Sequence, residues 1–149
     1  MGLFIHIILE IAALFALYWT IRTRKLVPAI VSIVMIAGII LVLYPEIQNK
    51  FYGLYVYMGA CLVAIIYGVT KLNGNRISAY IIILMSTSMF LHWLWVTQHL
   101  QGNTLIFPGI ALITGAVGLI SRAKLRNELG FLIILSADAI AIIVEQLLK

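Results

Sequence analysis

Apolar runs about as long as a membrane is thick follow one another along the chain, separated by short clusters of charged residues or of Gly, Pro and Asn. A hydrocarbon core about 30 Å thick needs about 20 predominantly apolar residues for one helical crossing. Each run has about that length, so the pattern predicts six transmembrane helices. Their expected bounds are residues 2–21, 26–44, 51–70, 77–98, 104–121 and 129–148.

The composition agrees with a membrane protein and excludes most soluble alternatives. The 149 residues are 64% hydrophobic and 10% charged, whereas an ordinary soluble domain is about 45–50% apolar and about 25% charged. Six spans take up about 120 residues and leave about 29 for the connections, too few for a nucleotide-binding fold or another soluble domain. We therefore expect an all-α membrane protein with a single transmembrane domain over residues 1–149.

Basic residues are concentrated in alternate connections between the predicted helices. The first, third and fifth connections hold eight of the ten Lys and Arg residues: Arg22, Arg24, Lys25, Lys71, Arg76, Arg122, Lys124 and Arg126. Because positively charged loops are retained in the cytoplasm, we expect these connections inside and both termini outside. The prediction is three helical hairpins of the same orientation in an integral multi-pass protein, expected in the bacterial cytoplasmic membrane.

Small residues at helical spacing mark two predicted packing surfaces. Lipid gives helices no hydrophobic reason to associate, so close contact depends on small side chains that let the backbones approach. Two of the predicted helices carry such stripes, formed by Ala60, Ala64 and Gly68 and by Ala111, Gly115 and Gly118. The stripes fit either packing within one chain or an interface between subunits.

Three acidic residues fall inside predicted spans, where ionisable groups are expensive and are functional candidates. At 1.5 Å per residue, Asp138 lies about 13 Å from the start of its helix, close to the bilayer midplane, and Glu10 lies about 12 Å from the start of the first helix. Glu145 is seven residues beyond Asp138 on the same helical face. Asp138 and Glu10 have no Lys or Arg at matching depth. Asp138 is interpreted as a proton or cation relay or a pore-lining charge, or else as a neutral acid hydrogen-bonded to a neighbouring helix. Glu10 is a second pathway candidate, and its alternative is neutralisation by His6, one turn away on the same helical face.

The predicted helix 77–98 is the most polar span. Ser88 and His92 share one of its faces, and a histidine titrates close to physiological pH, so His92 is a candidate proton shuttle. The alternative places His92 in the interfacial aromatic belt and bonds the hydroxyls to their own helix. By depth alone, one set of residues would form the wall of an outward-open polar cavity: His6, Glu10, His92, Glu145 and, beneath them, Asp138.

The basic connections suggest a second type of site. Six side chains would converge on one membrane face, namely Arg22, Arg24, Lys25, Arg122, Lys124 and Arg126. Around an oligomer they would hold an anionic ligand such as a nucleotide. The alternative is that they determine orientation and contact lipid phosphates.

Known catalytic and cofactor motifs are not found in the sequence. It has no GxSxG, HExxH, Walker or CxxC motif, and its single cysteine is Cys61. His6 and His92 fall at similar depth, which is a weak signal for axial haem ligation. We therefore expect no enzyme activity, cofactor or metal, and no direct binding to double-stranded nucleic acid.

The sequence favours a small oligomeric channel or transporter for ions or a small solute, gated by an anionic cytoplasmic ligand. Oligomerisation is expected because a six-helix bundle encloses little volume by itself. The alternative is a non-transporting accessory or assembly subunit of a larger membrane complex. The expected partners are membrane lipids and either further copies of the chain or other subunits.

Overall fold

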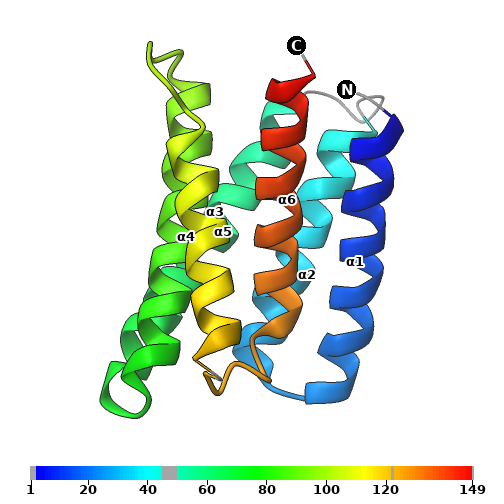
Figure 1. Cartoon of the computed structure of the whole chain (residues 1–149). Coiled ribbons are helices and arrows are strands. Elements are labelled where there is room, and N and C mark those ends of the chain that lie inside the picture. Colours follow the sequence, from blue (N-terminus) through cyan, green and yellow to red (C-terminus); the bar gives the residue numbers. More distant parts are fainter. Residues whose placement is uncertain (1–2, 45–49, 122, 149) are drawn as a thin grey trace.

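The computed structural model describes residues 3–44, 50–121 and 123–148, which form helices and connections and contain no strand. The helices lie side by side and alternate in direction along the chain (Figure 1). Their bounds are α1 (Leu3–Thr23), α2 (Leu26–Leu43), α3 (Lys50–Thr70), the short 3-10 helix η1 (Lys71–Asn73), α4 (Arg76–Thr97), α5 (Ile106–Ile120) and α6 (Leu129–Leu147).

Five helices, α1 to α4 and α6, are long and apolar enough to cross a membrane. The expectation of an all-helical, multi-pass membrane protein is therefore confirmed at this level. The surface of the bundle agrees with it, because large apolar side chains such as Leu14, Ile66 and Ile113 are about two-thirds exposed. In water such a surface would cause association, whereas in lipid it contacts acyl chains.

Helix α5 is shorter than the sequence pattern predicts. It has 15 residues and is about 22 Å long, so it falls short of a hydrocarbon core about 30 Å thick. Thr104 and Leu105, expected in this helix, form a turn in which the Asn103 side chain accepts a hydrogen bond from the Leu105 backbone N–H. Polar contacts at Asn103 and Thr104 thus displace the start of α5 to Ile106.

Helix α6 forms the centre of the bundle and packs against α1, α2, α4 and α5. It is drawn in orange to red between α1 and α5 in Figure 1. Phe131, Ile134 and Leu135 on this helix are fully buried, and they join a core that includes Met35 of α2 and Met89 of α4. A polar residue on the buried side of α6 is therefore surrounded by protein rather than by lipid.

Helices α2 and α3 approach each other closely at Gly38 of α2 and Gly53 of α3. A Cβ added to Gly53 would lie 2.8 Å from the Gly38 carbonyl oxygen and 2.8 Å from the Leu41 Cβ. A Cβ added to Gly38 would lie 3.0 Å from the Cβ of Tyr57. The two glycines therefore let α2 and α3 meet backbone to backbone and bring Tyr57 close to α2.

The predicted small-residue stripes lie in contacts within the chain. Gly68 packs against Ile82 and Ile83 of α4, and Gly115 lies beside Met85 and Ser136. Gly118 lies against Ile81 and Leu125, while Ala60, Ala64 and Ala111 are buried. These positions agree with packing inside one chain, and the subunit-interface alternative stays a prediction.

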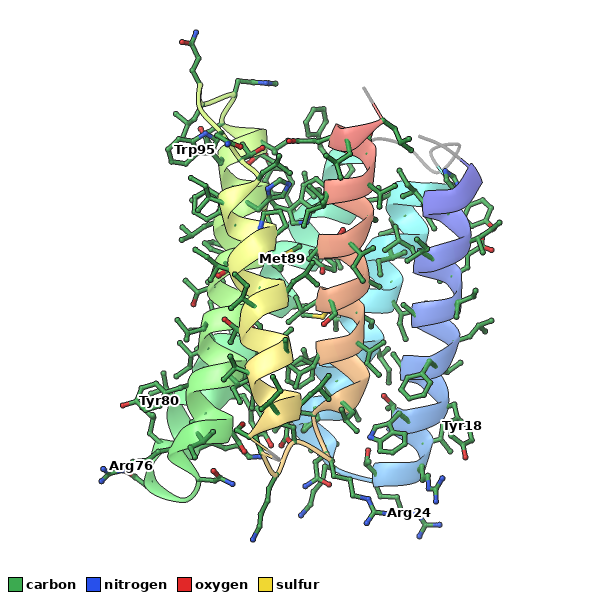
Figure 2. The ribbon with its side chains drawn as sticks, in the orientation of Figure 1. Tyr18, Arg24, Arg76, Tyr80, Met89 and Trp95 are labelled. Carbon is green, nitrogen blue, oxygen red and sulfur yellow. The ribbon has the colours of Figure 1, made fainter. Side chains whose placement is uncertain are left out.

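The basic side chains gather at one end of the bundle. Figure 2 labels Arg24 and Arg76 at this end and Trp95 at the other. Helix α1 begins and α6 ends at the end that carries Trp95 (Figures 1 and 2). We call the end with Arg24 and Arg76 the basic end.

Candidate functional site

Asp138 lies on the central helix α6 and is 6% exposed. The indole Nε1–H of Trp93, on α4, donates a hydrogen bond of 2.8 Å to its Oδ2. This interhelical bond pairs one carboxylate oxygen with a neutral donor. Among the described residues no cation forms an ion pair with Asp138.

A cavity of about 30 Å³ adjoins the Asp138 carboxyl and lies where five helices meet. Its lining comes from α1, α2, α3, α4 and α6 and consists of Leu9, Gly38, Ile39, Val42, Leu54, Tyr57, Trp93 and Asp138. The volume is sufficient for a water molecule, and the polar groups on the lining make a hydrated site physically reasonable. Asp138 is therefore an acidic group at the place where α1, α2, α3, α4 and α6 meet.

The Tyr57 hydroxyl completes this group, which we call the Asp138 site: Asp138, Trp93 and Tyr57. Tyr57 is buried, and its hydroxyl lies next to the Asp138 carboxyl without making a hydrogen bond of normal geometry. An unsatisfied buried hydroxyl costs about 1–3 kcal/mol. The site thus has an acceptor, a fixed donor and a hydroxyl that can act as either, as expected for holding a proton, a water or a small cation.

His92, predicted from helix 77–98, lies beside the Asp138 site through its contact with Trp93. His92 is 2% exposed, and its Nδ1 lies 3.3 Å from the Thr104 carbonyl oxygen. Its ring packs edge-on against Trp93 with centroids 5.2 Å apart. Ser88, one turn away, is also buried. His92 therefore lies behind the donor to Asp138 and connects it to the segment before α5.

Glu10 lies away from the Asp138 site. It is exposed in a groove on the surface of the bundle between α1 and α2, where the Tyr44 hydroxyl lies 3.4 Å from its Oε1. Its neighbour Leu9 lines the Asp138 cavity instead. His6 and Glu145 are half-buried on α1 and α6. The structure thus joins Asp138 to Trp93 and Tyr57, and places Glu10 on a different face from that cavity.

Glu128, just before α6, is a buried acid that the sequence analysis did not single out. It is fully buried and forms an ion pair through Oε1 with Lys71 of η1, while the Tyr67 hydroxyl donates 2.8 Å to the same oxygen. Its Oε2 has no hydrogen-bond partner among the described residues. One sequence signal points to Glu128. It is the only acid in a basic connection, and it directly precedes a helix whose N-terminus favours negative charge.

The predicted basic set divides in the structure. Arg22 and Arg126 line one pocket with Trp19, Thr23 and Asn127. Arg24, Lys25 and Lys124 are exposed and do not line it. Arg122 lies outside the described residues.

The described part of the chain holds no group of three or more His, Cys, Asp or Glu side chains that could bind a metal. Cys61 is buried and free. Comparisons of the chain with known protein families, characterised proteins and solved structures find no match. Function is therefore inferred from the geometry of the sites.

Proposed function

We propose that this protein is a small channel or transporter that moves protons, ions or a small solute across the membrane, with Asp138 as the charged group of its pathway. One observation carries the proposal. Asp138 is a buried acid without a cationic partner among the described residues, and it adjoins a cavity lined by five helices. An ionisable residue in such a place is expensive to keep unless its charge is used.

The helix junction supplies a way to couple that charge to movement. A carboxylate in a low-dielectric site attracts water and donors, and a neutral carboxylic acid does so less. Trp93 and Tyr57 come from α4 and α3, so a change in the charge on Asp138 alters the contacts of α6 with both helices. Binding and release of a proton or cation would shift the balance between two packings of the bundle.

The small size of the cavity favours a pathway that forms between chains, or one that opens only when the helices of one chain move apart. About 30 Å³ beside Asp138 is far smaller than a continuous aqueous pore. Ions would pass between chains of an oligomer, or through the bundle when its helices move apart. In this proposal the basic end faces the cytoplasm and both termini lie outside, as the distribution of Lys and Arg favours. An anionic ligand at the basic end would gate the pathway.

Flux through liposomes that contain only the purified protein tests the proposal. Asp138→Asn keeps the size of the side chain and an acceptor for Trp93 but removes the charge. We expect it to lower proton or cation flux at least about tenfold, which corresponds to about 1.4 kcal/mol in the barrier. Glu10→Gln is the matched control, because it removes an acid that lies outside the Asp138 cavity. Equal flux in the wild type and Asp138→Asn would contradict the assignment.

The second candidate is a non-transporting accessory subunit of a larger membrane complex. It is favoured by the Trp93–Asp138 hydrogen bond, since a carboxyl bonded within its own chain would also serve as a polar anchor between α4 and α6. In that case neither the wild type nor Asp138→Asn would conduct ions, and the variant would differ only in thermal stability. A chain that is stable alone as a homo-oligomer favours transport, and one that requires foreign subunits favours the accessory role.

A further inference from the structure

A polar pocket of about 180 Å³ lies at the basic end, between the last turn of α1 and the segment that leads into α6. Arg22 and Thr23 come from α1, and Arg126 and Asn127 come from the other side, with Trp19 between them. Figure 2 shows the neighbouring Tyr18 and Arg24 at this end of α1. Two arginines separated by more than 100 residues in sequence therefore share one small pocket.

Hydrogen bonds preform this pocket. The Trp19 Nε1–H donates 2.6 Å to the Arg126 carbonyl oxygen, which fixes the segment before α6 against α1. The Arg22 Nη1–H donates 3.2 Å to the Tyr18 hydroxyl. The guanidinium carbon of Arg22 also lies 5.9 Å from the centre of the Trp19 ring, a distance typical of a cation–π contact. Arg22 is thus held beside the pocket before any ligand arrives.

The positive charge of the pocket is not neutralised within the described residues. No carboxylate there forms an ion pair with Arg22 or Arg126, and the acid nearest in sequence, Glu128, pairs with Lys71 instead. Two arginines and Asn127 thus line a pocket without a paired carboxylate, so its lining is polar and positively charged. Guanidinium groups match the oxygens of phosphate in bidentate geometry, so phosphate is the expected ligand chemistry.

We propose that this pocket binds the phosphate group of an anionic phospholipid. Its volume is below the about 300–1,000 Å³ of pockets that enclose a small molecule or cofactor, which fits a headgroup phosphate and not a whole nucleotide. The adjoining surface of α1 is apolar, with Ile21 71% exposed and Tyr18 57% exposed. Acyl chains attached to the bound phosphate would lie along this surface, while Tyr18 and Trp19 occupy the interfacial layer that aromatic residues favour.

The inference does not depend on transport, because a lipid would bind whether or not the chain conducts. Native mass spectrometry of the detergent-purified chain, titrated with phosphatidylglycerol or phosphatidylcholine, tests it. The variant Arg22→Gln/Arg126→Gln is compared with Arg76→Gln/Lys124→Gln, which removes the same charge from the connections outside the pocket. We expect the pocket variant to weaken phosphatidylglycerol binding at least about tenfold and the control no more than about twofold, since only the former loses charge-assisted hydrogen bonds.

A third variant, Arg22→Lys/Arg126→Lys, keeps the charge and removes the planar donor pair, so binding of intermediate strength is expected. It also tests the pocket if the glutamine variant does not fold. Equal losses in the pocket and control variants would overturn the proposal, because binding would then follow total charge. Full displacement of the lipid by inorganic phosphate or by a nucleotide would also overturn it and would identify the pocket as a site for a soluble anion. So would equal binding of phosphatidylcholine.

Discussion

Replacing Lys71 with methionine is expected to lower the free energy of unfolding by about 3 kcal/mol. The Glu128 carboxylate is fully buried and pairs with Lys71. Removing the lysine leaves a buried charge whose remaining partner is the Tyr67 hydroxyl, and breaking a buried ion pair from one side costs about 3–5 kcal/mol. The lower end of that range applies because the Lys71 side chain is 25% exposed. Unfolding by SDS in detergent micelles, followed by tryptophan fluorescence, measures the change.

Two further variants separate the ion pair from a general loss of positive charge. The double variant Lys71→Met/Glu128→Gln removes both charges and is expected to recover most of the lost stability, since a neutral pair can replace a buried ion pair at little cost. Arg76→Met removes an exposed cation from the same end of the bundle and is expected to change stability by less than about 0.5 kcal/mol. If Lys71→Met and Arg76→Met unfold alike, the ion pair contributes little.

Gly53→Ala is expected to destabilise the protein by about 2 kcal/mol, within the range for overpacking a tight contact. The new methyl group would lie 2.8 Å from the Gly38 carbonyl oxygen and 2.8 Å from the Leu41 Cβ. Because one of these atoms belongs to the backbone of α2, α2 and α3 must move apart. The loss occurs even though alanine favours a helix over glycine by about 1 kcal/mol. Thermal unfolding in detergent micelles measures it.

Gly59→Ala is the matched control for Gly53→Ala. Gly59 lies on the same helix, and a Cβ added there meets no atom within 4 Å. Only the helix-propensity term remains, so the variant is expected to be neutral or slightly stabilised. Equal unfolding temperatures for the two variants would show that α2 and α3 are not held by the Gly38–Gly53 contact.

The helical type of every span, and the approximate length of each helix except α5, could be predicted because the bilayer thickness limits both. A chain without water around its backbone must satisfy its hydrogen bonds within each segment, so long apolar runs form helices. The start of α5 could not be predicted in the same way. It depends on His92 and Gln146, which contact Thr104 from α4 and α6, and contacts between distant segments leave no periodic signal.

The sequence could single out Asp138 but not the residues that it contacts. The midplane position of Asp138 singled it out, yet Trp93 and Tyr57 follow from which faces of α4 and α3 turn inward. Depth alone also grouped Glu10 with Asp138, although Glu10 lies in the α1–α2 groove. Gly38 and Gly53 were not singled out because neither has another small residue three or four positions away on its helix, and only their approach in space gives them a role.

Because α5 is short, the apolar surface of the bundle has a smaller height along α5 than along the other helices. The 15 residues of this helix leave about 8 Å of an average hydrocarbon core unmatched. Its lipid-facing stripe is aliphatic throughout, with Ile106, Ile110, Ile113, Val117 and Ile120 exposed. Hydrophobic mismatch costs a fraction of a kcal/mol per ångström, so we expect a bilayer around this bundle to be thinner along α5 than along α1. Short-chain lipids, or a second copy of the same short face, would relieve this mismatch, and we expect a thin bilayer to deform the protein least.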